Sequence, residues 1–335
     1  MALYKVCGLT IESTIPFPEL APADSKEPDY SFDALLESGV APSCHWSHHY
    51  YLSNGKPWLS LAGRDTDYHL QFPDLARFHV TTDPRTIRCY REPGVPLDSI
   101  MHLFLDVVIP LVLSQQGKLA LHASAVLISG KIVAFLGETR RGKSTIAASF
   151  GQQGFPVVTD DCLVVEEKGG QFFGIPYYPG LRLWPDTVSA LFGYDPLLPQ
   201  VAHYTDKKLL WAAKSSLPFC TTTNPLRRIY VLAANQEHGD TRDITIEPLS
   251  PRDAFMELVK YPYRLRISDR ERLRDEFEAL CRVVSSLTFR RMVFPQIFSL
   301  LPKIQETILT DLRDEGCFPK YSSQEKSGLD GCRNA

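Results

Sequence analysis

The sequence contains no pair of cysteines spaced for a zinc site or a redox motif. Its eight cysteines are scattered from Cys7 to Cys332, and no C-x-x-C pair occurs among them. No secretory leader is recognisable at the N-terminus, so nothing indicates an oxidising compartment. We therefore expect reduced thiols and a cytoplasmic protein.

Long apolar runs and an excess of charge are also missing. The most apolar stretch, Leu103 to Leu113, is too short to cross a bilayer and contains Asp106, so we expect no membrane partner. The 36 basic and 39 acidic residues leave a formal net charge of −3, so nothing indicates the basic footprint of a nucleic-acid-binding protein and we expect no nucleic-acid partner. No internal repeat is visible.

The length of 335 residues suggests about two domains. Residues 1–96 carry short apolar runs separated by Pro, Gly, Asp and Asn, which predicts a smaller β-rich domain for docking or accessory use. Residues 97–315 are predicted to form the main domain, and the polar residues 316–335 a disordered tail. Helical apolar spacing predicts a helix over residues 97–116 that Pro110 kinks or breaks and that packs under the main domain. Further helices are predicted over residues 252–261, 270–287 and 301–312.

One motif dominates the main domain. The nine residues Gly137, Glu138, Thr139, Arg140, Arg141, Gly142, Lys143, Ser144 and Thr145 fit the phosphate-binding pattern G-x-x-x-x-G-K-[ST]. An apolar run before the motif predicts a strand over residues 131–136, and a helix is predicted from Ser144 to Phe150. Backbone N–H groups and the helix N-terminus would attract an anion. Lys143 would reach the β- and γ-phosphates of ATP, and Ser144 would hold Mg²⁺.

The strand before the motif is predicted to pair with its predecessor. Only Ser129 and Gly130 separate residues 119–128 from residues 131–136, which predicts an antiparallel hairpin. Counting outward from the turn places His122 opposite Gly137, at the mouth of the loop. Such a hairpin predicts a mixed sheet rather than the usual doubly wound order. His122 is either a functional residue of the loop or a core histidine.

Two adjacent acids interrupt the next apolar strand. Asp160 and Asp161 lie between Val157-Val158 and the apolar run that begins at Leu163. Buried carboxylates are costly unless they meet cations or donors. Phosphoryl transfer needs one carboxylate near Mg²⁺ and another that accepts the hydroxyl proton. Because adjacent strand residues point to opposite faces, we expect the two acids to have different roles, with Asp160 facing the metal or a structural donor.

Three further polar residues are candidates for the walls of the site. Arg182 and Asp186 follow the acidic strand in a segment rich in Pro and aromatic residues, where Asp186 could instead cap a short helix. Lys207 could bring a cation to the transferred phosphate, or could belong to an ordinary surface charge pair.

Taken together, these motifs resemble the HPr kinase/phosphorylase-like proteins. The resemblance rests on His122 within residues 121–126, on the loop from Gly137 to Thr145, and on residues 158–161, and it covers residues 118–192 best. It implies an α/β fold of P-loop kinase type related to phosphoenolpyruvate carboxykinase. It also implies that Asp161 accepts the proton, that His122 supports this carboxylate, and that Lys143 and Ser144 bind phosphate and Mg²⁺.

The sequence also departs from the bifunctional members of that family. They carry a glutamate and a Gly-rich segment after the acidic strand, where this chain has residues 179–186. The resemblance therefore does not extend to the reverse phosphorylase reaction or to a second metal ligand. Residues 181–186 of that segment, together with residues 7–20, resemble a branch that includes kinases of lasso-peptide biosynthesis, which phosphorylate a serine near the C-terminus of a precursor peptide.

The sequence thus predicts an ATP- and Mg²⁺-dependent kinase that acts on a serine hydroxyl of a peptide. A small-metabolite kinase and a nucleotide-sensing protein without transfer chemistry are the alternatives. The expected partners are a nucleoside triphosphate and a peptide, and a homo-oligomer is compatible with the sequence.

Overall fold

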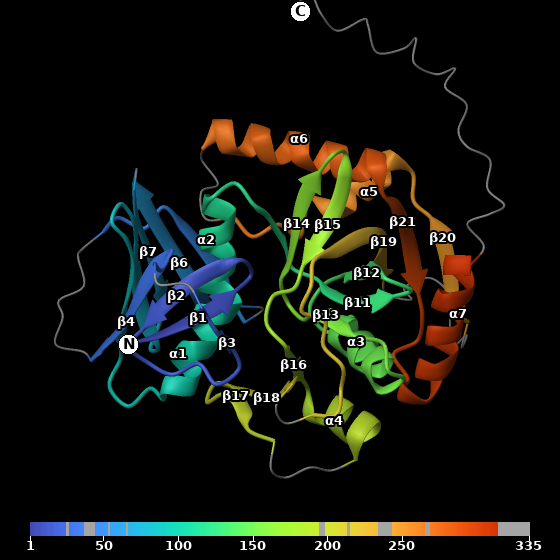
Figure 1. Cartoon of the computed structure of the whole chain (residues 1–335), viewed down its shortest axis with the longest axis horizontal. Helices are drawn as coiled ribbons and strands as arrows, with labels where there is room; N and C mark the ends of the chain where they lie inside the picture. The colour runs from blue at the N-terminus through green and yellow to red at the C-terminus, as the bar shows by residue number, and fades with distance from the viewer. Residues whose placement is uncertain are drawn as a thin grey trace, which may run out of the picture.

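The computed structural model describes residues 1–24, 27–36, 44–52, 54–64, 66–193, 198–212, 215–233, 243–264 and 269–313. These residues form a mixed α/β structure with two nine-stranded sheets and one three-stranded sheet (Figure 1). The predicted tail, residues 316–335, lies outside the described residues.

The first large sheet contains the strands described before residue 97. Its order is β3 (Ala21–Pro22), β1 (Ala2–Val6), β2 (Leu9–Ser13), β4 (Tyr30–Leu36), β9 (Arg85–Arg91), β8 (Ala76–Thr82), β7 (Asp67–Phe72), β6 (Pro57–Arg64) and β5 (His48–Tyr51). β4 pairs in parallel with β2 and with β9. Buried and half-buried residues alternate along β8, so one face of this sheet is turned toward a core.

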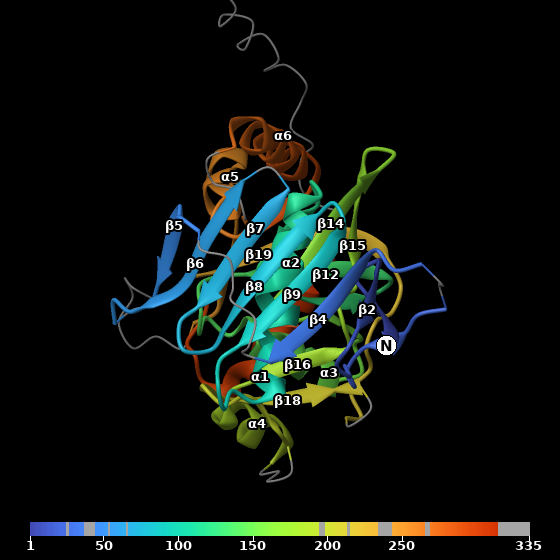
Figure 2. The same cartoon turned by 90° about the vertical axis from the view of Figure 1, so that its left-hand side faces the viewer.

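A long helix covers that face of the first sheet (Figure 2). It consists of α1 (Leu97–Leu103), the π-helical turn η1 (Phe104–Val108) and α2 (Ile109–Gln115). Phe104 stacks on Phe32 of β4, with ring centroids 4.0 Å apart, and one hydrophobic cluster joins the helix to the sheet. The sequence predicts that the helix packs under the main domain, whereas the structure shows it sharing most of its core with the first sheet. The boundary between the two domains stays a prediction.

Pro110 does not interrupt this helix. It is the second residue of α2, directly after the π turn, where the regular α-helical hydrogen-bond pattern is already interrupted. The helix is therefore longer than the apolar run suggests. Residues Leu97–Gln115 have a mean hydropathy of 1.8 and the length to cross a membrane, but 67% of the window is buried inside the protein. That burial is typical of a core helix.

The second large sheet carries the predicted phosphate loop. Its main order is β10 (Leu119–Leu121), β14 (Leu163–Lys168), β15 (Gln171–Ile175), β19 (Asn224–Ala233), β12 (Lys131–Leu136), β11 (Ser124–Ile128) and β13 (Val157–Thr159), with β21 (Thr288–Val293) and β20 (Thr245–Pro248) continuing from β19. β12 is antiparallel to β11 but parallel to β19, which confirms the predicted mixed sheet.

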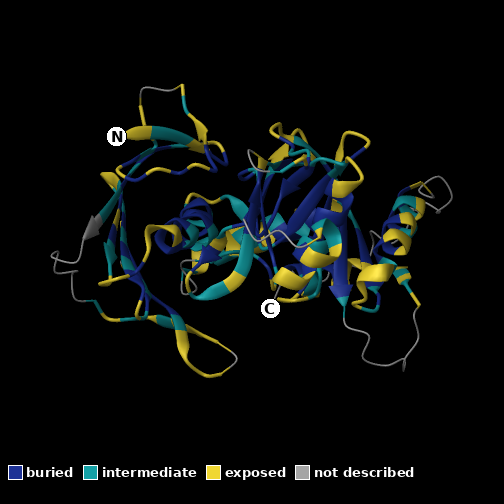
Figure 3. Cartoon of the chain, turned by 90° about the horizontal axis from the view of Figure 1, so that it is seen from below, coloured by how far each residue is buried: buried dark blue, intermediate teal, exposed yellow. Residues whose placement is uncertain are grey.

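Helices cover both faces of the second sheet. Val133 and Phe135 of β12 belong to a cluster with α3 (Lys143–Gln152) and α7 (Leu301–Arg313). The alternate residues of β12 belong to a second cluster with α5 (Pro251–Leu258) and α6 (Arg270–Ser286). Figure 3 shows these strands as the buried centre of this part of the molecule. Burial on both sides explains why the sequence of β12 is almost continuously apolar.

The predicted hairpin is correct at its turn and wrong at its far end. Ile128 pairs with Lys131 as predicted, and pairing continues to Ser124 opposite Phe135. The chain then leaves β12: the N–H of His122 donates to the carbonyl of Tyr261, and β10 pairs with β14. His122 is therefore not opposite Gly137, because the predicted single strand is two strands with different partners.

A small third sheet closes one side of the loop region. It contains β16 (Gly180–Leu183), β18 (Thr205–Trp211) and β17 (Gln200–Ala202). The helix α4 (Pro185–Phe192) comes directly after β16 in the sequence. α4 begins one residue before Asp186, and its N-cap residue is Trp184. The predicted cap role of Asp186 is thus wrong. Asp186 lies in the first turn, where its Oδ1 accepts a hydrogen bond from the Thr187 N–H at 2.6 Å.

Candidate active site

The loop from Gly137 to Thr145 joins the end of β12 to the start of α3. Gly142 has φ +88°, a left-handed conformation that favours glycine, and directly precedes the first helical residue. A Cβ atom added at Gly137 would lie 3.1 Å from the carbonyl oxygen of Leu232, so only glycine fits without a shift. The fold therefore requires glycine at both positions, at Gly142 because of its φ angle and at Gly137 because of the close approach of Leu232.

Lys143 lies at the centre of the loop. Its Nζ donates to the carbonyl of Gly137 at 2.8 Å and to that of Glu138 at 3.2 Å. The side chain is buried, and this burial lowers the pKa of the ammonium. The carbonyl oxygens hold the positive charge inside the loop, where the N-terminus of α3 adds to the attraction for an anion.

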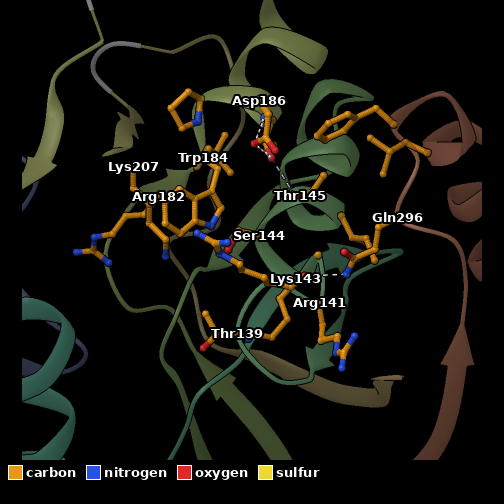
Figure 4. Close-up of a pocket in the computed structure, with 18 of the residues that line it drawn as sticks. Thr139, Arg141, Lys143, Ser144, Thr145, Arg182, Trp184, Asp186, Lys207 and Gln296 are labelled. Carbon is orange, nitrogen blue, oxygen red and sulfur yellow. Dashed lines mark hydrogen bonds between the residues drawn. The ribbon is translucent and has the colours of Figure 1, made fainter. Parts of the chain in front are cut away.

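A cavity of about 750 Å³ opens over the loop (Figure 4). Thr139 to Thr145 line it, whereas the side chain of Glu138 points to solvent and pairs with Arg141 at 3.2 Å. The other predicted site residues that line the cavity are His122, Asp161, Arg182, Asp186 and Lys207. The structure thus brings together most of the residues chosen from the sequence.

Asp160 and Asp161 lie in a bend between β13 and β14, not inside one strand. Asp160 points away from the cavity: Ser124 Oγ donates to its Oδ1 at 2.6 Å, and the Arg182 N–H donates to its Oδ2 at 3.0 Å. Of the two predicted roles for Asp160, this geometry favours the structural one over the metal ligand. Asp161 lines the cavity and has φ +68°, so the bend, rather than strand alternation, separates the two carboxylates.

The two carboxyl groups have opposite pKa shifts. Burial, together with the neighbouring charge of Asp161, raises the pKa of Asp160 to about 6. Burial also raises the pKa of Asp161, but the attraction of Lys207, His122, Arg182 and Lys143 outweighs it and holds that pKa well below the usual range. Asp161 is therefore ionised at neutral pH, as a proton acceptor must be.

Arg182 connects Asp161 to the long helix. Its Nη1 lies 3.7 Å from Asp161 Oδ2 and also forms an ion pair with Asp106 on the π turn η1. The guanidinium is 3% exposed and lies over the ring of Tyr178 at 4.8 Å. His102, one turn before Asp106, lies 2.8 Å from its other carboxylate oxygen. Arg182 therefore orients Asp161, and the π turn supplies the opposing charge that keeps Arg182 in place.

His122 reaches Asp161 through a tyrosine. The hydroxyl of Tyr263 donates to the backbone carbonyl of Asp161 at 3.0 Å and lies 3.1 Å from His122 Nδ1. Because a hydroxyl has one proton, Nδ1 must be the donor to Tyr263, which leaves the lone pair on Nε2. Burial and the charge of Lys143 lower the pKa of His122 to about 4, so the ring is neutral at pH 7.

Three features of the site, two of them behind the cavity wall, are not predicted from the sequence. Asp106 was visible as an acid inside an apolar run, which is a signal for a buried ion pair. Tyr263 and the segment from Phe294 to Phe298 carry no such signal, because only the tertiary fold brings them to the loop. No group of three or more His, Cys, Asp or Glu residues suited to a metal ion occurs within the described ranges.

Comparison with known proteins adds little to this geometry. No family model and no curated protein matches the chain. Among solved structures, the HPr(Ser) kinase/phosphatase from Coxiella burnetii matches with 15% sequence identity and a TM-score of 0.32, over 58% of this chain and 95% of that one. This identity and this score are too low to indicate a function for this chain.

Proposed function

We propose that this protein is an ATP-dependent kinase that transfers the γ-phosphoryl group to a serine hydroxyl of a peptide. The observation that carries the proposal is the position of Asp161. An ionised carboxylate, surrounded by Lys143, Arg182 and Lys207, lines the same cavity as the phosphate loop. A protein that only binds nucleotide does not need a proton acceptor there.

The residues present fit Mg²⁺ carried by the nucleotide. Mg²⁺ usually keeps several waters and takes one or two protein ligands besides the phosphate oxygens, so a cage of protein ligands is not required. Ser144 would be the ligand from the loop, and Asp161 lines the same cavity. When bound, Mg²⁺ supplies charge neutralisation on the phosphates.

The chemistry assigned to the chain is positioning and proton transfer. The loop N–H groups and Lys143 hold the triphosphate, and Lys207 offers a further cation in the same cavity. As the serine oxygen bonds to the γ-phosphorus and the bond to the ADP oxygen breaks, the hydroxyl proton passes to Asp161. Arg182 orients that carboxylate, and neutral His122 with Tyr263 fixes the backbone that carries it.

The peptide acceptor is supported by the sequence resemblance to kinases of lasso-peptide biosynthesis in residues 7–20 and 181–186. A precursor peptide with a serine near its C-terminus is the acceptor we propose. We also propose a cytoplasmic location: all six cysteines in the described part of the chain are free thiols, as expected where disulfides do not persist.

The test uses γ-labelled ATP, Mg²⁺ and three kinds of acceptor. These are a peptide ending in serine, the same peptide ending in alanine, and a panel of hydroxylated metabolites. Label on the serine peptide alone supports the proposal, and label on a metabolite makes the protein a small-molecule kinase. If the protein binds ATP but transfers phosphate to none of the acceptors, and if Asp161→Asn binds ATP with the same affinity, the protein would be a nucleotide sensor.

A further inference from the structure

The cavity over the phosphate loop has two chemically different ends. One end carries Asp161, Arg182 and Lys207. The opposite end is formed by the segment Phe294 to Phe298, between β21 and α7, together with apolar residues of α7. In Figure 4, Arg182 and Lys207 lie on one side of Lys143, and Gln296 lies on the other.

The apolar segment is attached to the phosphate loop itself. Gln296 Nε2 donates to the backbone carbonyl of Arg140 at 2.7 Å. The ring of Phe294 lies so near Gly142 that a Cβ atom added there would be 3.6 Å from it. A ligand held by the loop therefore meets this segment in a fixed position.

Two large apolar side chains of the segment remain open to the cavity. Ile297 is 43% exposed and Phe298 is 38% exposed, whereas Phe294 is buried against the loop. Of the exposed large apolar side chains found within the described ranges, these two line the cavity. Apolar surface of this kind beside a polar site is typical of a ligand contact.

We propose that Ile297 and Phe298 form the nucleobase site of the bound nucleotide. The inference rests on the proposed nucleotide binding. The γ-phosphate must face Asp161 for transfer, so the ribose and base extend from the loop toward the other end of the cavity. A nucleobase has flat apolar faces, which an aromatic ring and an aliphatic side chain can cover.

Trp184 is the competing aromatic residue in the cavity. The guanidinium of Arg140 lies 4.6 Å from its ring centroid, and Lys207 Nζ lies 5.8 Å from it. Its ring thus already contacts cations, and it lies at the charged end near the acceptor. This position suits contact with phosphate or acceptor better than stacking on a base.

The test compares two probes that share the phosphates and differ in the base. Binding of ATP and of inorganic tripolyphosphate to the full chain is measured by calorimetry. Since base stacking on an aromatic side chain is a substantial part of affinity, Phe298→Ala should weaken ATP binding about tenfold and leave tripolyphosphate binding unchanged. Phe277→Ala is the matched control, because Phe277 is an exposed phenylalanine outside the cavity and should change neither affinity.

Other outcomes separate the two proposals. Equal losses for both probes in Phe298→Ala, with an unchanged melting temperature, would mean that Phe298 supports the loop and not the base. If Trp184→Leu loses the preference for ATP over tripolyphosphate and Phe298→Ala keeps it, the base would lie at the charged end of the cavity, beside Trp184. If the wild-type protein binds ATP no more tightly than tripolyphosphate, the base site is overturned and the proposed phosphate binding is not. Failure to bind either probe overturns the proposed function and this inference with it.

Discussion

Replacing Asp161 by asparagine should separate chemistry from binding. Asparagine keeps the shape of the side chain and, like aspartate, tolerates the positive φ of +68° at this position. It cannot accept the serine proton as a carboxylate does. We therefore expect phosphoryl transfer to fall by about 100-fold or more, the usual contribution of a positioned general base.

The same substitution should change stability and ATP affinity in opposite directions. At an effective dielectric of about 20, unit charges separated by the 3.7 Å between Asp161 and Arg182 attract by about 4 kcal/mol before desolvation is counted. Because Arg182 keeps its ion pair with Asp106, we expect the free energy of unfolding to fall by less than the 3–5 kcal/mol or so that breaking a buried pair outright costs. Removing a negative charge from the cavity should strengthen the binding of the anionic nucleotide.

The assay needs three measurements on one preparation. Urea denaturation gives stability, calorimetry gives the ATP dissociation constant, and mass spectrometry gives phosphate on the acceptor peptide. Asp206→Asn is the matched control, since it removes an exposed carboxylate from the same cavity and should leave the transfer rate unchanged. Wild-type transfer by Asp161→Asn, with ATP bound normally, would refute the role of Asp161 as proton acceptor.

Four further predictions concern the residues around Asp161. Lys143→Ala should abolish nucleotide binding measured by calorimetry, because the charge on the β- and γ-phosphates is lost; normal turnover would mean that the loop is wrongly assigned. Ser144→Ala should shift the Mg²⁺ concentration needed for half-maximal transfer upward, and an unchanged titration would contradict a metal role. The pKa of His122 is about 4 in the folded protein, against an ordinary value of 6.5. As the pH falls from 6.5 toward 4, the imidazole is protonated in the unfolded chain before it is protonated in the folded protein, so the free energy of unfolding decreases over this range. His122→Gln should reduce this decrease when denaturation is measured at about pH 7 and at about pH 5. Asp106→Asn should lower both stability, by about 3 kcal/mol, and the transfer rate, because Arg182 loses the partner that holds it; transfer at the wild-type rate would show that Arg182 does not need Asp106 to orient the proton acceptor.

The local parts of the fold could be predicted from the sequence. The strand–loop–helix arrangement from β12 to α3, the hairpin turn at Ser129-Gly130 and the helices α5, α6 and α7 follow from patterns within a few residues. The mixed sheet followed from the hairpin. These features depend on backbone preferences and apolar spacing, which are properties of short segments.

The errors arose where a long-range partner decides the local structure. His122 lies just after the end of β10 because β10 pairs with the distant strand β14, with Leu121 opposite Leu163. The sequence predicts Asp160 and Asp161 inside a strand, but they lie in a bend, where Ser124 and Arg182 donate hydrogen bonds to Asp160. Tyr263 and Phe298 enter the site from distant elements, so no pattern within one segment could mark them.

The packing of the helix Leu97–Gln115 has a consequence for how the protein can be divided. Within the described ranges no residue before His122 lines the cavity, yet the first sheet covers a helix that is long and apolar enough to cross a membrane. A truncated protein starting at residue 97 would retain every cavity residue and expose an apolar helical surface to solvent. Such a fragment would aggregate or associate with detergent and lipid, and Asp106 would lose the packing that aims it at Arg182. We therefore expect the N-terminal sheet to be needed for the proposed chemistry, although none of its described residues lines the cavity.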